Sequence, residues 1–345
     1  MWLFLAVVCI IQQTTETEEF LRKRHLNPQE SMTPNEIIQY WRYPSEEHEI
    51  LTDDGYYLLV NRIPYGIHSP GKTGSRSVVL LVHGILLESR CWIANLPNNS
   101  IGFVLADAGY DVWMINTRGT TWSRRHRNLS IDQEEFWDFS FHEIAIYDIP
   151  ATINFILQKT KQEKLYFIGH SQGGTSGFIA FSVLPHLAKK IKLVMTFAPV
   201  YTLVGVNGPV LTFLILPEGL ITSRADVYFG IFPDFTSVKD AIHWVQVFQS
   251  KELKYFDYGS KNKAVYNMTT PPFYNIEDMV VPTALWNAGN DKMVDKKDIE
   301  LLLPRITNLV FHKYIPDWQH SDFMWGIDAP TCLFPDVLYL MQKYK

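Results

Sequence analysis

A pentapeptide of sequence Gly-His-Ser-Gln-Gly at residues 169–173 has the composition and the setting of a nucleophilic serine. It follows an apolar, strand-like run at residues 164–168 and precedes a helix-like segment at residues 174–181. A turn that exposes the Ser171 hydroxyl between a strand and a helix is so sharp that it leaves no room for a Cβ on either side, which favours the two glycines. The N-terminus of the following helix would also stabilise a negative charge developing nearby. In this setting the motif predicts a catalytic serine rather than a surface turn.

A serine hydroxyl needs a base to accept its proton and an acid to orient that base. Four histidines follow Ser171, and we favour His320 as the base. It lies just past the last apolar strand and before a C-terminal helix, and a loop at the carboxyl end of a strand is where a catalytic histidine belongs. The other three lie close behind the serine helix, in helical surroundings or within a strand, and are interpreted as packing or surface residues: His186, His243 and His312.

The acid that would orient His320 is predicted to be Asp291. It follows a strand-like run at residues 283–286 after a short loop, so it too lies at the carboxyl end of a strand. Asp295 is the alternative, although its place before two lysines is typical of a helix N-cap. The resulting order along the chain is serine, acid and histidine, which is the order expected when a serine of this kind is followed by its partners in a parallel α/β sheet.

Two backbone N–H groups are predicted to stabilise the oxyanion that forms when a serine attacks a carbonyl group. The first belongs to Gln172, the residue after the nucleophile. The second belongs to Ile85, in the turn that follows the buried strand expected at residues 78–82. Gly84 precedes Ile85 and would let the backbone approach closely. Together with the serine, histidine and aspartate, these two N–H groups would complete the machinery for acyl transfer.

The elements that must position these residues form an alternating pattern of strands and helices. Short apolar runs typical of buried parallel strands recur at residues 78–82, 110–115, 165–168, 193–197, 283–286 and 309–314. Helical patterns separate several of them, most clearly at residues 143–159, where Pro150 lies near the start or at a kink. A short helix is expected at residues 34–41 and a hairpin around Asp53-Asp54-Gly55. We therefore predict the α/β class, with a mostly parallel sheet and helices on both faces.

The composition excludes several other classes of protein. Hydrophobic residues make up 47% and charged residues 19% of the 345 positions, which is enough apolar material for a large core and argues against disorder. The net charge of -5 gives no sign of a nucleic-acid surface. The one dense basic cluster, at residues 124–127, is explained better by a solvated or locally paired surface segment than by a polyanion site. No metal site is predicted.

The N-terminus has the character of a signal peptide, which we place at residues 1–17. Residues 1–11 form an apolar run that suits a signal-peptide core and is too short for a membrane span. A buried first helix is the alternative interpretation. Cleavage is expected near residues 14–17, and the polar residues 16–33 are expected to form a loosely held arm.

Three sequons are consistent with the secretory route, at Asn98, Asn128 and Asn267. Removal of the signal peptide would leave two cysteines, so the mature chain is not a disulfide scaffold. The sequence leaves open whether Cys91 and Cys332 pair or stay free.

Over nearly its whole mature length, from about residue 35 to about residue 342, the sequence resembles the acid lipases, the family of the gastric and lysosomal lipases. The resemblance is specific because two long matching strings, residues 92–100 and 105–113, carry no general hydrolase chemistry. The other matching motifs are shorter: His83-Gly84-Ile85-Leu86, Arg118-Gly119, residues 169–173, Trp286-Asn287, Asp291, and His320 with Asp322-Phe323.

The resemblance implies an α/β-hydrolase fold in which Ser171, Asp291 and His320 match the triad and Ile85 and Gln172 match the oxyanion positions. It also implies a serine ester hydrolase that cleaves fatty-acid esters of neutral lipids, such as triacylglycerols or cholesteryl esters, at a membrane or emulsion interface and without a cofactor. A secreted protein is expected, with a lysosomal one as the alternative.

The chain departs from the family between the serine and the acid. Ser171 and Asp291 are 120 positions apart (291 minus 171), and roughly fifty residues of the cap and lid that normally gate such a site are missing. We therefore expect an α/β-hydrolase domain at residues 34–345 with a reduced cap around residues 201–250. Two alternatives follow from this departure: a lidless esterase for short, soluble esters, and an inactive lipase-like paralogue or truncated isoform with a lipid-binding role.

Overall fold

One sheet organises the protein. A computed structural model describes residues 27–67, 76–206 and 224–345, so the expected signal peptide and residues 207–223 of the expected cap lie outside the described residues. Within the described part the sheet has nine strands in the order β1-β2-β4-β3-β6-β7-β8-β9, with β5 paired to β2. The strands are β1 (Glu46–Leu51), β2 (Tyr56–Ile63), β3 (Val78–Val82), β4 (Asp111–Ile115), β5 (Arg125–His126), β6 (Leu165–His170), β7 (Ile191–Phe197), β8 (Thr283–Ala288) and β9 (Leu309–Ile315).

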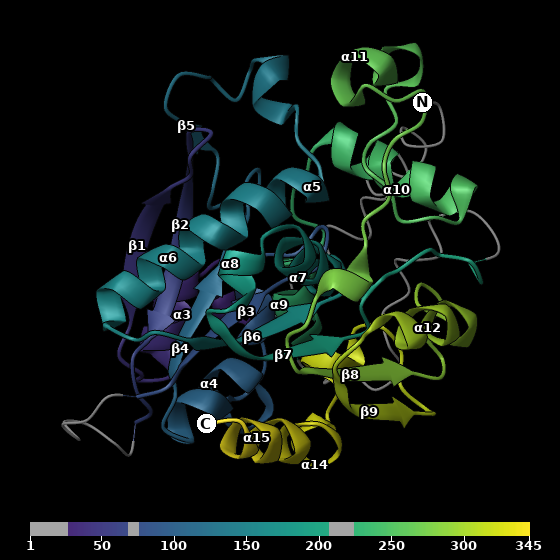
Figure 1. Cartoon of the computed structure of the whole chain (residues 1–345). Coiled ribbons are helices and arrows are strands. Elements are labelled where there is room, and N and C mark those ends of the chain that lie inside the picture. The colour runs from purple at the N-terminus through teal and green to yellow at the C-terminus, as the bar shows by residue number, and fades with distance from the viewer. Residues whose placement is uncertain (1–26, 68–75, 207–223) are drawn as a thin grey trace, which may run out of the picture.

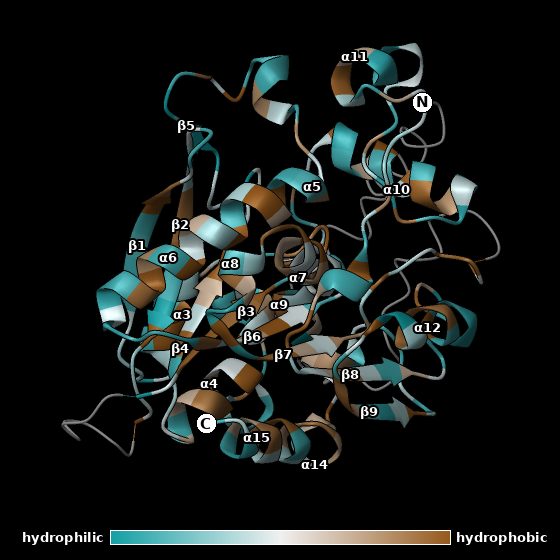
Figure 2. Ribbon diagram, in the orientation of Figure 1, coloured by the Kyte–Doolittle hydropathy of each residue, from teal (hydrophilic) through white to brown (hydrophobic). Residues whose placement is uncertain are grey.

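The pairing of the strands confirms the predicted class. Across the sheet, the pairings along β4, β3, β6, β7, β8 and β9 are all parallel. The strands β1 and β2 form an antiparallel hairpin that joins the sheet through an antiparallel pairing of β2 with β4. All residues of β3, β4, β6 and β8 are buried, which explains why these strands read as unbroken apolar runs rather than as alternating patterns. Figure 2 shows hydrophobic residues concentrated on the central strands.

Helices cover both faces of this sheet, as Figure 1 shows: α4, α14 and α15 lie beneath it, and α6 lies on the opposite side. The helices of the described chain are α3 (Pro34–Tyr40), α4 (Ile101–Asp107), α5 (Phe141–Glu143), α6 (Ile149–Thr160), α7 (Gln172–Val183), α8 (Pro185–Ala188), α9 (Ala225–Phe229), α10 (Val238–Ser250), α11 (Asn262–Tyr266), α12 (Lys296–Leu302), α13 (Asp322–Trp325), α14 (Ala329–Cys332) and α15 (Phe334–Lys343).

The helix expected at residues 143–159 is interrupted near its start. A π-helical turn at Ile144–Asp148 joins α5 to α6, and Pro150 lies in the first turn of α6, where its missing N–H needs no acceptor. The π turn directs Asp148, which is fully buried, toward Arg118. The π-helical turn therefore ends at the residue that forms the buried ion pair with Arg118.

The structure contains the hairpin expected around Asp53-Asp54-Gly55 and shows local pairing in the basic cluster at residues 124–127, as predicted from the sequence. Gly55 has a φ of +105° between β1 and β2, which favours glycine at that turn. The cluster at residues 124–127 contains the two-residue strand β5, and two of its side chains are locally paired: Arg125 with Glu49, and Arg124 over the ring of Phe235.

Arg118 is the central member of a buried ionic network. Only 1% of its surface is exposed, and its guanidinium pairs with Asp148 at 2.7 Å and with Asp54 at 2.6 Å while lying 4.0 Å from the ring centroid of Tyr56. Burial raises the pKa of Asp148 to about 6 even beside this cation, so the carboxylate depends on Arg118 to stay ionised.

We expect Arg118→Met to lower the free energy of unfolding by about 3–5 kcal/mol, because it leaves the charge of Asp148 buried and unpaired. Denaturant titration at pH 7 measures this. Arg125→Met is the matched control, since the Arg125 side chain is 61% exposed and its ion pair with Glu49 should contribute at most about 1 kcal/mol. Similar effects of the two substitutions would show that the buried network does not stabilise the fold.

Candidate active site

Ser171 lies in a strained turn between β6 and α7. Its φ of 54° and ψ of -125° are unusual for a residue with a side chain, and its surface is 2% exposed. A Cβ on Gly169 would lie 2.6 Å from the backbone nitrogen of Gly174, and a Cβ on Gly173 would lie 2.2 Å from the carbonyl oxygen of Val82. The structure thus confirms that both flanking positions exclude a side chain.

His320 and Asp291 meet at the carboxyl edge of the sheet. Nδ1 of His320 donates to Oδ2 of Asp291 at 2.7 Å. The second carboxylate oxygen, Oδ1, accepts the N–H groups of Met293 at 2.8 Å and of Val294 at 2.9 Å. Three donors therefore fix the carboxylate, and the carboxylate in turn leaves Nε2 of His320 as the ring nitrogen that can accept a proton.

Nε2 of His320 is buried and has no hydrogen-bond partner among the described residues. No hydrogen bond joins it to the Ser171 hydroxyl within that part of the chain. Catalytic hydrogen bonds are often long or poorly aligned before substrate binds, so this arrangement is compatible with Nε2 of His320 accepting the Ser171 proton once substrate is bound.

His170, the residue before the serine, ties the histidine loop to the serine turn, a contact that sequence reasoning missed. Its Nε2 donates to the backbone carbonyl of His320 at 2.9 Å, and the two rings lie 4.7 Å apart between centroids. Burial lowers the pKa of His170 well below its usual value, which keeps the ring neutral beside His320. The signal available in the sequence was the histidine that directly precedes the serine in the motif.

The turn after β3 lies directly against the nucleophile. A Cβ on Gly84 would approach the Cβ of Ser171 to 2.9 Å, so this position too excludes a side chain. The His83 ring holds the turn in place, because Nδ1 donates to the Gly84 carbonyl at 2.8 Å and Nε2 accepts the Thr117 N–H at 3.2 Å. The N–H of Ile85 has no acceptor among the described residues.

Gln172 is the first residue of α7, a position whose N–H has no acceptor within the helix. The structure therefore brings both predicted oxyanion donors to the neighbourhood of Ser171. An anion there would also face the positive end of the α7 dipole.

The alternatives considered from the sequence have other partners. Asp295 is the N-cap of α12, where its side chain accepts the Asp298 N–H at 2.9 Å. Nε2 of His312 forms a hydrogen bond with Oδ1 of Asn287 at 2.8 Å, and His186 is exposed on α8. His243 is buried on α10 and stacks on Phe141 at 3.9 Å between ring centroids.

A contact from α10 to the nucleophile turn was not foreseen. Nε1 of Trp244 donates to Oε1 of Gln172 at 2.5 Å. The Gln172 side chain also favours the ionised form of the buried Asp240 carboxyl, whose pKa it lowers against the effect of burial. Asp240 itself accepts the Phe141 N–H and the Thr236 hydroxyl, each at 2.8 Å. Asp240 and Trp244 are four residues apart and share one helix face, which was the only sequence signal.

Asp240 is expected to make the fold sensitive to pH. Burial raises the pKa of Asp240 from 3.8 to about 7, so the folded protein binds a proton that the unfolded chain has released. The free energy of unfolding should therefore fall as pH rises from about 4 to about 7. Asp240→Asn should flatten this fall and make the protein more stable at pH 8, by on the order of 1–3 kcal/mol, with little change at pH 4.

Denaturant titrations of wild type and Asp240→Asn at pH 4, 6 and 8 measure this difference. Asp336→Asn is a control, because that carboxylate is partly exposed beside Lys313 and should leave the pH profile nearly unchanged. A variant less stable than wild type at pH 8 would mean that the hydrogen bonds of the Asp240 carboxylate outweigh the unfavourable burial of its charge.

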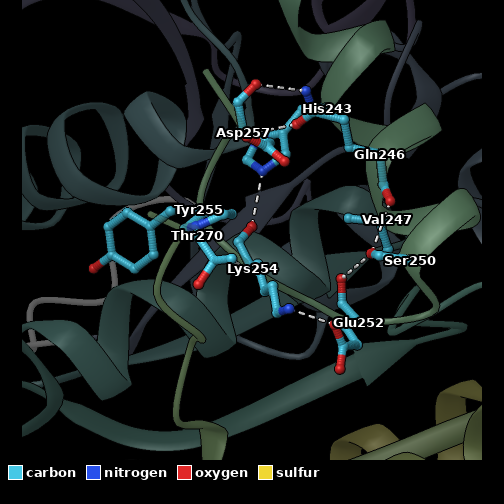
Figure 3. A pocket seen from close by; sticks show the side chains of 10 residues that line it. His243, Gln246, Val247, Ser250, Glu252, Lys254, Tyr255, Asp257 and Thr270 are labelled. Atoms are coloured by element: carbon cyan, nitrogen blue, oxygen red, sulfur yellow. Dashed lines mark hydrogen bonds and ion pairs between the residues drawn. The ribbon is translucent and has the colours of Figure 1, made fainter. Parts of the chain in front are cut away.

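A cavity beside α10 is separate from the triad. It has a volume of about 120 Å³ and is lined by His243, Ser250, Glu252, Lys254 and Asp257, among others. Figure 3 shows that these polar groups pair with one another: Lys254 with Glu252, and Nε2 of His243 with the Lys254 carbonyl. None of the residues that line this cavity belongs to the predicted triad or to its oxyanion donors, so the cavity is not part of the candidate active site.

Two family models match the chain. One, described as a partial alpha/beta-hydrolase lipase region, matches residues 34–96, and the other, described as the alpha/beta hydrolase fold, matches residues 77–212. The solved structure of an esterase from Pyrococcus furiosus is similar with a TM-score of 0.53 and 14% identity, and the match covers 89% of this chain and 95% of that one. At this identity the similarity concerns the fold alone, which it supports.

Three human proteins are similar over almost the entire chain. Lipase member M is 44% identical over 99% of this chain and 93% of its own length. Lysosomal acid lipase/cholesteryl ester hydrolase is 43% identical over 98% of each chain, and gastric triacylglycerol lipase is 41% identical over 100% of each. The last alignment spans 397 positions whereas this chain has 345 residues, so at least 52 positions (397 minus 345) have no counterpart here.

Proposed function

Because the chain belongs to the acid lipase family of the α/β-hydrolase fold, and is therefore a carboxylic ester hydrolase, we propose that it cleaves long-chain fatty-acid esters of neutral lipids with Ser171 as the nucleophile. The observation that carries this proposal is the pairing of His320 with Asp291 at 2.7 Å beside the strained serine turn. Triacylglycerols and cholesteryl esters are the substrates named for the gastric and lysosomal relatives, and we extend them to this chain.

In the proposed reaction Ser171 attacks the ester carbonyl while Nε2 of His320 takes its proton. The N–H groups of Ile85 and Gln172 stabilise the negative charge on the carbonyl oxygen. His320 then donates the proton to the leaving alcohol, and an acyl-enzyme forms on Ser171. Water attacks the acyl-enzyme with His320 again acting as base, and the fatty acid is released. Asp291 holds His320 in register throughout.

We further propose that the missing positions belong to the cap, in the connection between β7 and β8. This connection spans residues 198–282 and contains α9, α10 and α11. The Trp244–Gln172 hydrogen bond brings α10 against the serine turn, so what remains of the cap still borders the site. A reduced cap around residues 201–250 would shorten the apolar wall available to a long acyl chain. The 52 unmatched positions, if they belong to the cap as proposed, therefore favour a second candidate function, hydrolysis of short, soluble esters.

Two measurements test these functions. A fluorophosphonate probe should label the purified wild-type protein and fail to label Ser171→Ala, because only an activated serine reacts. Turnover should then be compared between a soluble butyrate ester and emulsified trioleoylglycerol. Higher kcat/KM on the emulsion supports the lipase, activity on the soluble ester alone supports the short-chain esterase, and a folded wild type that is not labelled would contradict both in favour of an inactive, lipid-binding paralogue.

We propose that the mature protein begins after a signal peptide at residues 1–17 and is secreted, with lysosomal delivery as the alternative. The human relatives include a gastric and a lysosomal enzyme. The three sequon asparagines, Asn98, Asn128 and Asn267, are all exposed and open to glycosylation. Cys91 and Cys332 are free thiols in the structure. Among the described residues, no helix is long and apolar enough to span a membrane.

A further inference from the structure

Lysines gather at the amino-terminal edge of the parallel sheet, the edge opposite the serine. Residues 159–164, 189–192 and 343–345 hold eight lysines and a single acidic side chain, Glu163, although the whole chain has a net charge of -5. Five of the lysines lie next to the starts of β6 and β7 or at the end of the chain, and we call them the lysine edge: Lys164, Lys189, Lys190, Lys192 and Lys345.

Backbone and side-chain contacts draw these three segments together. Leu165, at the start of β6, donates its N–H to the Lys190 carbonyl at 2.9 Å, so Lys164 and Lys190 precede adjacent strands. The Tyr166 hydroxyl donates to the carbonyls of Met341 at 2.6 Å and Tyr344 at 3.1 Å, which places the end of α15 beside the same strand. Nζ of Lys192 lies 5.1 Å from the Tyr166 ring centroid.

Side-chain carboxylates of the described chain do not pair with the lysine edge. Within the described chain, none of its five lysines forms an ion pair with a carboxylate. Lys190 donates to the neutral amide of Asn154 and Lys192 to the hydroxyl of Ser77. Burial, followed by the charges of Lys164 and Lys345, lowers the pKa of Lys192, which shows that like charges face one another here.

From this geometry we propose that the lysine edge is a docking surface for a sulfated polysaccharide. Unpaired lysines on three converging segments match a chain that carries a negative charge at each repeat, and the gain on binding is the release of its counterions. The anion-binding character of the lysine edge does not depend on the proposed catalytic function, whereas the choice of a polysaccharide over a membrane rests on it.

The orientation of the site favours a soluble polyanion over an anionic membrane. Lys164 precedes β6 and Ser171 follows it, so six residues of extended strand, roughly 20 Å, separate the two edges. A membrane bound at the lysine edge would hold the serine turn away from the lipid. A polysaccharide bound there would tether the protein and leave the serine edge free.

The test measures binding of a fluorescent heparin dodecasaccharide to the full-length mature protein at 50 and 150 mM NaCl. The triple variant Lys164→Gln/Lys189→Gln/Lys345→Gln changes only exposed lysines, and we expect it to raise Kd about tenfold at 50 mM NaCl and to reduce the dependence of log Kd on log salt. The matched control is Lys261→Gln/Lys296→Gln/Lys297→Gln, which removes the same charge from exposed positions on other elements and should change Kd less than twofold.

Three outcomes would overturn the proposal: no binding by the wild type at 50 mM NaCl, an equal loss in the control variant, or tighter binding to vesicles of phosphatidylserine than to the saccharide. Ser171→Ala should bind the saccharide as the wild type does, so a failure of the catalytic proposal would be seen separately.

Discussion

Replacing Ser171 with alanine is expected to lower kcat for ester hydrolysis about 10⁶-fold, since the nucleophile is lost while the oxyanion donors remain. Only the hydroxyl is removed, and the strained backbone between β6 and α7 is unchanged. KM should change little, because the groups that would contact the rest of the ester are not altered. Steady-state turnover on a chromogenic ester, combined with fluorophosphonate labelling, measures both effects.

Ser176→Ala provides the matched control for that substitution. Ser176 lies on the same helix, is fully buried, and its hydroxyl has no hydrogen-bond partner among the described residues. Removing an unsatisfied buried hydroxyl should leave turnover within about twofold and stability equal or slightly higher. If both variants lost activity equally, the loss would reflect packing of α7 rather than removal of a nucleophile, and the assignment of Ser171 would be wrong.

The serine turn could be predicted from the sequence because its constraints are local. The requirement for glycine at positions 169 and 173 arises from atoms within a few residues and from the adjacent strand β3, and a Cβ at either position would clash as expected. The core strands could be predicted equally well, since strands that are buried on both faces must be apolar throughout. Their predicted ends differ from β6 and β8 by only two residues.

The contacts around the turn could not be predicted because they join segments far apart in the sequence. Trp244 reaches Gln172 across 72 positions, and His170 reaches the His320 carbonyl across 150. Nothing in the pattern of α10 distinguishes a helix that packs on the serine turn from any other amphipathic helix. The π turn before α6 also escaped prediction, since the ion pair between Arg118 and Asp148 that it serves is a tertiary contact.

The contact from α10 bears on whether the proposed reduction of the cap would leave the proposed site intact. The hydrogen bond from Trp244 holds the Gln172 side chain, and the backbone N–H of the same residue is the proposed oxyanion donor. On the proposal that the cap is reduced around residues 201–250, the part that remains includes the helix that supports the serine turn. This favours retained chemistry with altered acyl-chain selectivity over loss of chemistry.

Asp291→Asn is the second substitution with a large expected effect, a decrease in kcat of about 10⁴-fold. In the wild type, Oδ2 of Asp291 accepts the Nδ1 proton of His320, so Nε2 is free to act as a base. An asparagine keeps an oxygen for the N–H groups of Met293 and Val294 and turns its NH₂ toward His320. The ring must then carry its proton on Nε2, where it can no longer accept one from Ser171.

Asp295→Asn distinguishes this effect from a general loss of charge at the same loop. Asp295 caps α12 through the Asp298 N–H, and asparagine is an equally good N-cap, so stability and turnover should both stay close to wild type. The rate of fluorophosphonate labelling should fall with kcat in Asp291→Asn and be unchanged in Asp295→Asn. The reverse result would make Asp295 the acid, because the variant that slows acylation without unfolding the protein identifies the carboxylate that orients the base.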